Sequence, residues 1–266
     1  MNLKVKNTAL LLLLSGTGSR FKNPVPKQFI RIPQKNTKDE KEENSTPLFS
    51  TTIRNLIHGV SFSHSILAVH KDYLESKLFA APYSLLQKEF PKIHWSCVAG
   101  GKSRHHSFLA AAKKCFEVTG ENTSLLIHDA NRPNLSAPYL SRIQEHINKL
   151  NSSTPCFIPV IPVSDSICTL DNENNQNPDS SKVLSYAQRG ELSRIQTPQL
   201  LHGPTTHSLI TKGTAKSRQP DYPGKNKDYT DDFTDEGSFL LASGHPVYTF
   251  EGDPGNIKIT YPEDAK

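Results

Sequence analysis

The sequence predicts an α/β fold in which a mostly parallel sheet carries helices on both faces. Short apolar runs alternate with helical patterns along the chain, an order typical of parallel sheets. The first run, Ala9–Leu14, contains no polar residue, as expected of a strand buried on both faces. With 266 residues the chain is long enough for one large domain, and we assign residues 1–266 to it.

Each element is predicted by its own pattern. Apolar runs of strand length predict strands at Ala9–Leu14, Ser65–Val69, His94–Val98, Leu125–His128, Phe157–Val163 and Val247–Phe250. Helical patterns predict helices at Pro47–His58, Arg104–Val118, Pro138–Leu150 and Asp231–Ser243. In such sheets ligands bind beyond the carboxyl ends of the strands, so the residues after each strand are the first candidates for a site.

Three stretches contain almost no apolar residues, and we expect them to be solvated loops. They are residues 34–46, 171–181 and 211–228, in which only Ala215 and Tyr222 are apolar. These stretches dilute the apolar content of the chain, which is 35%. The remainder is therefore closer to an ordinary globular composition.

Composition excludes several classes of protein. The net charge of +5 suits phosphate-bearing partners but is too small to indicate nucleic-acid binding. No stretch approaches the ~20 apolar residues that span a membrane, and the short apolar run near the start lacks the cleavage pattern of a secretory signal. The four cysteines show no CxxC spacing, which argues against a zinc ribbon or a thioredoxin-type site. Four thiols in a chain of this length are more typical of a reducing compartment, such as the cytoplasm, than of a disulfide framework. The histidine pair at 105–106 has no zinc-ligand partners at suitable spacing, so we expect it on a helix surface.

The first strand is followed directly by a glycine loop, SGTGSR at residues 15–20, and then by Lys27. Two glycines in a tight turn let backbone N–H groups approach an anion, and Arg20 and Lys27 add positive charge, which predicts a triphosphate site. A dinucleotide fingerprint would need a small residue where Phe21 stands. A purely structural turn is the other alternative.

Two further turns lie at the same edge of the predicted sheet. Gly100–Ser103 ends like a P-loop, but the full pattern needs glycine where Ser96 stands. Asp129 follows the fourth strand, where a carboxylate can meet a divalent metal or a ribose hydroxyl. Alternatively, Asp129 caps the turn before Pro133.

Taken in order, six motifs resemble those of the 2-C-methyl-D-erythritol 4-phosphate cytidylyltransferase family, and the likeness extends from Ala9 to Asp264 apart from the three polar stretches. The motifs are Gly16-Thr17-Gly18-Ser19-Arg20 with Pro26-Lys27-Gln28-Phe29, Gly100-Gly101 with Arg104 and Ser107, His128-Asp129-Ala130 with Arg132-Pro133, Thr197-Pro198-Gln199, Thr234-Asp235-Glu236 with Ser238, and Asn256-Ile257-Lys258-Ile259-Thr260 with Pro262-Glu263-Asp264. Six ordered motifs are far more specific than one glycine loop.

The resemblance implies a Rossmann-like fold with a protruding β-arm at about residues 157–196. It implies transfer of a cytidylyl group from CTP to 2-C-methyl-D-erythritol 4-phosphate, with release of pyrophosphate, in non-mevalonate isoprenoid precursor synthesis. The implied cofactor is Mg²⁺ and the implied assembly is a homodimer through the arm. CTP and a polyol phosphate would be the partners, with neither nucleic acid nor membrane.

The resemblance also implies roles for the matching residues. The catalytic groups around the α-phosphate would be Arg20, Lys27 and Lys258. The nucleotide would be bound by Ser15, Gly16, Gly18, Gly101, Arg104, Ser107, Asp129 and Ala130. The acceptor would be bound by Ser166, Arg189, Thr197 and Thr234. Asp129 would be the metal ligand, with Mg²⁺ held mainly by the triphosphate.

The chain departs from the family's usual pattern at several positions. Asn131 replaces a small apolar residue, Ser166 replaces threonine and Gly255 replaces aspartate. Two alternatives stay open: a ribitol-5-phosphate cytidylyltransferase, which shares the CTP motifs, and a non-catalytic nucleotide-binding homologue. A Rossmann-type dehydrogenase is disfavoured by Phe21 and Lys27.

Overall fold

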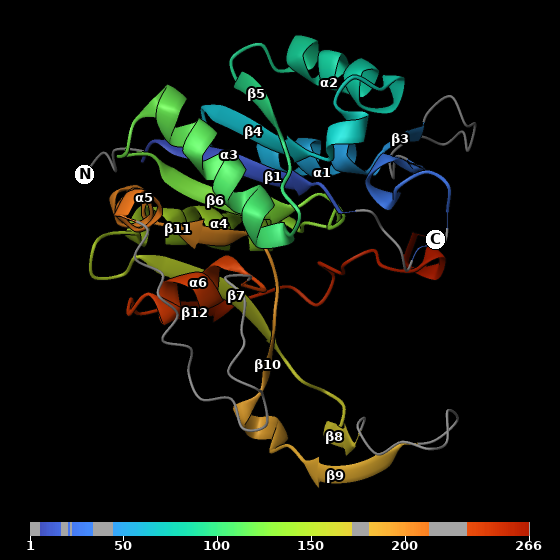
Figure 1. The fold of residues 1–266 in the computed structure, drawn as a ribbon, viewed down its shortest axis with the longest axis vertical. Helices are drawn as coiled ribbons and strands as arrows, with labels where there is room; N and C mark the ends of the chain where they lie inside the picture. The colour runs from blue at the N-terminus through green and yellow to red at the C-terminus, as the bar shows by residue number, and fades with distance from the viewer. Residues whose placement is uncertain are drawn as a thin grey trace.

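The computed structural model describes residues 6–16, 21, 23–33, 45–171, 181–212 and 233–265. At its centre is an eight-stranded sheet with the strand order β10-β7-β11-β6-β1-β4-β5, in which β12 also pairs with β7 (Figure 1). The strands are β1 (Thr8–Leu14), β4 (His64–Val69), β5 (His94–Ala99), β6 (Ser124–Asp129), β7 (Cys156–Pro162), β10 (Ser193–Ile195), β11 (Gln199–Leu201) and β12 (Tyr248–Glu251).

The sheet is mixed, with a parallel block at its centre. β5, β4, β1 and β6 run parallel to one another, and β12 runs parallel to β7. β10 and β11 are antiparallel to β7, and β11 is also antiparallel to β6. Because β11 runs against β6, the residues just before β11 lie next to the carboxyl end of β6.

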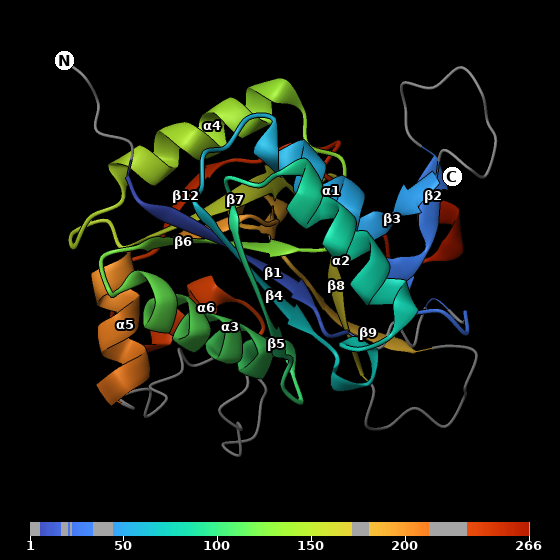
Figure 2. The ribbon, with the colours of Figure 1, turned by 90° about the horizontal axis from the view of Figure 1, so that it is seen from above.

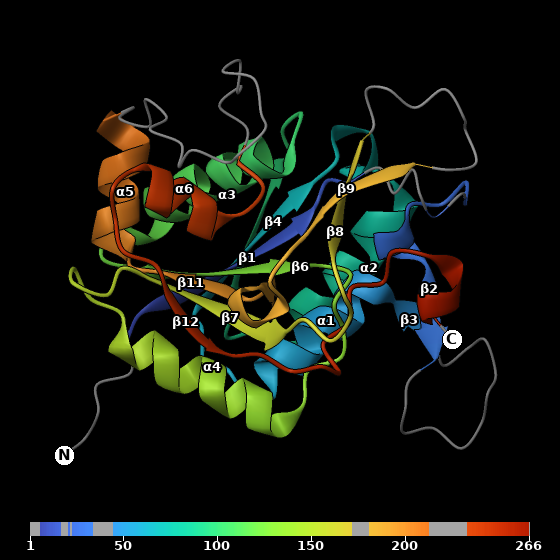
Figure 3. The same cartoon turned by 90° about the horizontal axis from the view of Figure 1, so that it is seen from below.

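Helices cover both faces of this sheet, in two layers that Figures 2 and 3 show on opposite sides. One layer contains α1 (Leu48–Ile57), α2 (Lys77–Glu89) and α4 (Ala137–Lys149). The other contains α3 (Arg104–Thr119), α5 (Gly203–Lys212) and α6 (Glu236–Ala242). The predicted α/β class, with helices on both faces of a largely parallel sheet, is confirmed.

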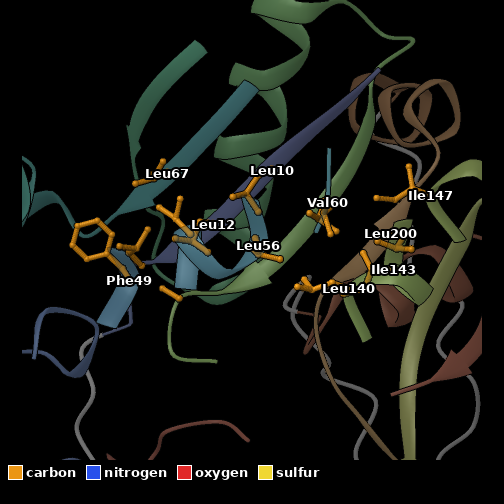
Figure 4. Packing of buried hydrophobic residues seen from close by; sticks show 14 of the residues in the cluster. Leu10, Leu12, Phe49, Leu56, Val60, Leu67, Leu140, Ile143, Ile147 and Leu200 are labelled. Carbon is orange, nitrogen blue, oxygen red and sulfur yellow. The ribbon is translucent and has the colours of Figure 1, made fainter. Parts of the chain in front are cut away.

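The surroundings of β1 explain why Ala9–Leu14 is apolar throughout. Leu10 and Leu12 pack into the cluster beneath α1, α2 and α4, and Figure 4 shows them near Phe49 of α1. Ala9 and Leu11 point the other way, into the cluster beneath α3, α5 and α6. All four of these side chains are 0% exposed. A strand with two buried faces favours apolar residues on both of them.

The six predicted strands are all present, with their ends shifted by a residue or two. The four predicted helices are present as well, but the last one begins later than expected. It starts at Glu236, because the carboxylate of Asp235 accepts a hydrogen bond from the backbone N–H of Ser238 at 2.7 Å and caps the helix. Residues 231 and 232, at the start of the expected helix, lie outside the described residues.

Sequence reasoning missed α2, α5 and the short strands β10 and β11. Helix α2 contains Pro82 and buries Phe79 and Leu86, so few of its residues follow a helical apolar pattern. Strands of three residues, such as β10 and β11, are too short for a period of two to be recognised.

A two-stranded arm projects from the main sheet. β8 (Cys168–Asp171) and β9 (Lys182–Tyr186) pair antiparallel in a sheet of their own, and Figure 1 shows them beyond the end of β7 and β10. Large apolar side chains on this arm are open to solvent: Leu170, Leu184 and Tyr186 are 45%, 59% and 74% exposed. A β-arm therefore lies within the expected range 157–196.

Several residues at the ends of the three polar stretches belong to strands or a helix, where we expected loops. Ser45 and Thr46 form part of β3 (Ser45–Pro47), which pairs with β2 (Arg31–Pro33). Asp171 ends β8, and residues 211–212 end α5. The interiors of the stretches lie outside the described residues. No described helix has the length and apolar character needed to cross a membrane.

Candidate active site

A cavity of about 450 Å³ lies where the parallel strands β1, β4, β5 and β6 end. Open α/β sheets bind their ligands at this edge. The cavity is lined by Leu13, Leu14, Ser15, Gly16, Lys27, Gln28, His70, Gly101, Lys102, Ser103, Arg104, Asp129, Ala130, Asn131 and Lys258. Lysine and arginine outnumber carboxylates in this lining, so the cavity suits a ligand with several negative charges.

The end of β1 is held by a buried glutamine. The Nε2 of Gln28 donates to the backbone carbonyl of Leu14 at 2.7 Å and to that of Gly16 at 2.9 Å. Phe29, the next residue, is buried in the core. Lys27 is therefore carried by a short helical turn, η2 (Lys27–Phe29), that is anchored directly beside the first loop.

Serine hydroxyls join the loops that follow β1 and β5. The hydroxyl of Ser107 donates to the carbonyl of Ser103 at 2.7 Å, so its oxygen accepts from the hydroxyl of Ser15 at 2.6 Å and from the backbone N–H of Gly101 at 3.1 Å. These contacts leave little room between the loops. A Cβ atom on Gly100 would lie 2.3 Å from the Cβ of Ser15.

Gly16 lies just after the end of β1, beside the cavity. Among the described residues, a Cβ on Gly16 would meet no atom within 4 Å, and the left-handed glycines there are Gly120 and Gly244. The backbone at Gly16 is therefore not left-handed, and the approach of its N–H group to an anion stays a prediction. Its missing side chain instead leaves open space beside the cavity.

Asp129 is the hub of the charged groups in the cavity. Its Oδ1 accepts from Nε of Arg104 at 3.2 Å, and its Oδ2 accepts from Nζ of Lys258 at 2.8 Å and lies 3.6 Å from Nε of Arg132. Burial alone would raise the pKa of Asp129, but the charges of Arg104, Lys258 and Arg132 outweigh burial and hold the pKa well below its usual range. The carboxylate contacts these cations and does not cap the turn before Pro133.

A second carboxylate, Glu236, lies behind Arg104. Its two oxygens accept from Nη1 and Nη2 of Arg104 at 2.7 and 3.1 Å, and its side chain is 0% exposed. Burial raises the pKa of Glu236, and the Arg104 guanidinium opposes that rise. Burial likewise opposes the charge of Arg104, but Glu236 and Asp129 raise its pKa above the ordinary value. Arg104 therefore bridges two carboxylates that come from different elements.

A buried histidine, His128, is linked through Thr197 to the backbone of Asp129. Nε2 of His128 lies 3.0 Å from the carbonyl of Arg132, which can only accept, so Nε2 carries the proton. Burial lowers the pKa of His128 to about 4, so the ring is neutral at pH 7 and its Nδ1 accepts from the hydroxyl of Thr197 at 2.9 Å. The oxygen of Thr197 in turn accepts from the backbone N–H of Asp129 at 3.2 Å.

The segment that carries Lys258 has no regular secondary structure, and hydrogen bonds on both sides hold it in place. The Nδ2 of Asn131 donates to the carbonyl of Ile259 at 2.6 Å, and Ile259 N–H donates to the carbonyl of Asn131 at 2.9 Å. Nη1 of Arg132 donates to the carbonyl of Asn256 at 2.8 Å. Asn131, where the family usually has a small apolar residue, thus anchors Lys258.

The structure brings most of the expected nucleotide-side residues together. Eight line the cavity: Ser15, Gly16, Lys27, Gly101, Arg104, Asp129, Ala130 and Lys258. Ser107 lies next to the cavity, bonded to Ser15 and Gly101. Gly18 and Arg20 lie outside the described residues, so their assignments stay predictions.

The expected acceptor-side residues are not gathered at the cavity. Ser166 and Arg189 are exposed residues of the arm, and Thr234 is exposed just before α6. Arg189 lines a second hollow with Val160 and other residues at the base of the arm. Thr197 is 4% exposed, and its hydroxyl is engaged by His128, so a contact with the acceptor would require that hydroxyl to change partners.

Sequence reasoning missed Glu236, His128 and Gln28 as contributors to the site. Each lay inside a motif, but nothing local indicated that it would support a neighbour. The expectation for one histidine was also wrong: His105 is 4% exposed and its ring lies 5.0 Å from that of Phe233, because this face of α3 packs under α6.

The comparison with known families accords with this geometry. A family model described as "IspD: 2-C-methyl-D-erythritol 4-phosphate cytidylyltransferase" matches residues 8–266. The chain belongs to this cytidylyltransferase family. The resemblance drawn from the six motifs is thereby confirmed, together with the class of enzyme.

Relatives in the cytidylyltransferase family align over most of the chain. The 2-C-methyl-D-erythritol 4-phosphate cytidylyltransferase of Thermosipho melanesiensis is 26% identical over 254 residues, which cover 96% of this chain and 92% of that protein. The protein of the same name from Dictyoglomus thermophilum is 30% identical over 218 residues, or 82% of this chain and 81% of that protein. The bifunctional enzyme IspD/IspF of Bartonella bacilliformis is 28% identical, covering 97% of this chain and 55% of that protein.

Solved structures of the cytidylyltransferase family share the fold. A crystal structure of 4-diphosphocytidyl-2C-methyl-D-erythritol synthase superimposes with a TM-score of 0.67 at 19% identity, covering 98% of this chain and 95% of that one. The Thermus thermophilus enzyme gives a TM-score of 0.59 at 18% identity, covering 98% of this chain and 95% of that one. The Rossmann-like assignment is confirmed.

The cytidylyltransferase family implies Mg²⁺, and the cavity offers it one carboxylate. In the described part of the chain no group of three or more His, Cys, Asp or Glu residues could hold a metal ion by itself. In nucleotide sites Mg²⁺ is usually bound by one or two carboxylates together with phosphate oxygens and water. Asp129 is a single carboxylate of this kind, and Mg²⁺ would have to take the place of Arg104 or Lys258 on one of its oxygens.

Proposed function

We propose that this chain transfers the cytidylyl group of CTP to 2-C-methyl-D-erythritol 4-phosphate and releases pyrophosphate, in the synthesis of isoprenoid precursors. The main support is the convergence of Lys27, Arg104, Asp129 and Lys258, from separate segments, on one cavity of a chain that belongs to this family. The relatives' names state the same acceptor.

The base of CTP would lie against the serine-linked loops. Ser15, Gly101 and Ser107 present a hydroxyl and backbone groups at the ends of β1 and β5. The carbonyl of cytosine needs a hydrogen-bond donor, and its amine needs an acceptor. The close approach of Gly100 to Ser15 narrows this part of the cavity, so a purine would be excluded by size.

Lys27, Lys258 and Arg20 would surround the α-phosphate. A phosphate oxygen of the acceptor attacks the α-phosphorus, and the bond from that phosphorus to the bridging oxygen of pyrophosphate breaks with its electron pair. The attacking phosphate is already ionised at neutral pH, so the step needs no general base, and the neutral, fully engaged His128 is not required to act as one. Catalysis then consists of positioning and stabilisation of negative charge on the α-phosphate.

Asp129 and Ala130 would meet the ribose and metal side of the nucleotide. Asp129 would hold Mg²⁺ together with the triphosphate, and the bound ion would neutralise part of the charge that the leaving pyrophosphate develops. The lowered pKa of Asp129 keeps its carboxylate ionised, as a metal ligand must be.

The acceptor site would be completed by a second copy of the chain. Ser166 and Arg189 lie on the arm, away from the cavity of their own chain, and Leu184 and Tyr186 expose apolar surface there. A homodimer in which the arm of one subunit reaches the partner's cavity would bring these residues to the acceptor, together with Thr197 and Thr234. Exposed apolar patches of this kind favour an interface. We place this dimer in the cytoplasm, where CTP is available.

Pyrophosphate release tests the proposed function. Purified protein with CTP and Mg²⁺ should release pyrophosphate when 2-C-methyl-D-erythritol 4-phosphate is added and much less when ATP replaces CTP. A parallel reaction with ribitol 5-phosphate identifies the acceptor. Release of pyrophosphate with ribitol 5-phosphate alone would mean that ribitol 5-phosphate is the acceptor. If neither acceptor supports release, the chain is not a cytidylyltransferase of these substrates.

A further inference from the structure

Glu236 is a buried charge that the proposed chemistry leaves without a role. Its side chain is 0% exposed, and it is absent from the lining of the cavity. Both of its oxygens accept hydrogen bonds from Arg104, which does line the cavity. The hydrogen bonds of its side chain therefore connect Glu236 to the cavity through Arg104.

The backbone around Glu236 is fixed as firmly as its carboxylate. The Oε1 of Gln199 accepts from the backbone N–H groups of Glu236 and Gly237 at 3.0 and 2.9 Å. Asp235 and Ser238 cap the first turn of α6 reciprocally. Gln199 opens β11, the strand that pairs with β6, so the carboxylate is held at a fixed place relative to the end of β6.

The guanidinium of Arg104 is oriented by two carboxylates at once. Its Nη atoms face Glu236, and its Nε lies 3.2 Å from Oδ1 of Asp129. A planar guanidinium with a bidentate partner on one edge has little freedom to rotate. Without Glu236, both Nη groups would lose their buried acceptor, and the most accessible replacement is Asp129. Arg104 would then compete with Lys258 for the same carboxylate.

We propose that Glu236 is a positioning residue of the transfer reaction, which orients Arg104 at the nucleotide cavity and prevents it from taking over the carboxylate of Asp129. Arg104, Arg132 and Lys258 carry three positive charges around Asp129 and Glu236, which carry two negative charges. Removing the charge of Glu236 leaves three positive charges against one negative charge and leaves the Nη groups of Arg104 without their acceptor, which favours a rearrangement of Arg104.

The variant Glu236→Gln tests the role, because it keeps the size of the side chain and removes its charge. A misplaced Arg104 should raise the KM for CTP by about tenfold or more, since small displacements of a binding group are costly. The KM for the acceptor should stay within about twofold, because Glu236 touches only a nucleotide-side group. An unchanged KM for CTP in a folded variant would overturn the proposal.

A matched control is available elsewhere in the chain. Glu89 receives a similar pair of hydrogen bonds from Nε of Arg54, at 3.0 and 2.9 Å, between α2 and α1 and away from the cavity. Glu89→Gln should leave both KM values unchanged. Glu89→Gln can lower the melting temperature without affecting the site. If Glu236→Gln likewise lowers the melting temperature and changes neither KM, Glu236 is a structural residue and the proposal fails.

A double-mutant cycle tests whether the effect passes through Arg104. In an Arg104→Lys background, Glu236→Gln should raise the KM for CTP no further, whereas additive effects would overturn the proposal. If Glu236→Gln does not fold, Glu236→Asp keeps the charge and shortens its reach, so its KM for CTP should lie above that of the wild type; a wild-type value would overturn the proposal. Because this inference rests on the proposed function, wild-type turnover is measured first, and its absence would count against that function alone.

Discussion

Nζ of Lys258 lies 2.8 Å from Oδ2 of Asp129. The two residues are 129 positions apart in the sequence. Lys258 sits on a segment without regular secondary structure, whereas Asp129 ends a buried central strand. This ion pair holds the long side chain of Lys258 at a point where the phosphates of a bound nucleotide would also attract its positive charge.

Replacing Lys258 by methionine should lower kcat by ~10²–10³, because a charge donor to the α-phosphate is lost. The fold should survive, since Asp129 keeps Arg104 and Arg132 as partners. Steady-state pyrophosphate release measures the effect. Lys149→Met, on the exposed surface of α4, is the control; a kcat for Lys258→Met equal to that of the control would remove Lys258 from the site.

Lys27→Ala should abolish measurable turnover. Its turn is anchored by Gln28 and Phe29, so the loss of the lysine side chain removes charge from the cavity without releasing the backbone. Circular dichroism and the melting temperature should match the wild type. Near-normal turnover would show that Lys27 does not act on the α-phosphate.

Gly100→Ala should destabilise the protein by about 1–3 kcal/mol, as overpacking in a closed site does. The new Cβ would lie 2.3 Å from the Cβ of Ser15, so the first loop must move and the affinity for CTP should fall. Gly190→Ala is the matched control, because a Cβ there would meet no atom of the described residues within 4 Å. Urea denaturation compares the two variants; equal midpoints would mean that the loops after β1 and β5 are not closely packed.

Burial of neutral His128 should make the stability depend on pH. The pKa of His128 is lowered to about 4 in the folded state, below its value of 6.5 in the unfolded chain. Its contribution of about 3 kcal/mol is therefore complete above the unfolded pKa and is lost as the pH falls from about 6.5 towards 4.

The variant His128→Gln isolates this contribution, since glutamine does not titrate. The difference in unfolding free energy between wild type and variant should shrink between pH 7 and pH 4, whereas other titrating groups affect both proteins alike. A difference that is constant with pH would mean that the pKa of His128 is the same in the folded and unfolded states.

Much of the fold was predictable because its signals are local. The unbroken apolar run at Ala9–Leu14 follows from burial on both faces, and Gly100 lies where the loops after β1 and β5 approach each other closely. Elements with weak local signals were missed: α2 contains a proline and buries few residues, and β11 has three residues.

By itself, the sequence determined the α/β class, six of the strands and four of the helices, the edge of the sheet at which the cavity lies and the family to which the chain belongs. Only the tertiary structure decided which charges meet. Glu236 and Arg104 are 132 residues apart, and Thr197 and His128 are 69 residues apart. Such contacts depend on the path of the whole chain. β11 pairs antiparallel with β6, and Gln199 of β11 binds the first residue of α6. No local pattern of residue types predicts this arrangement.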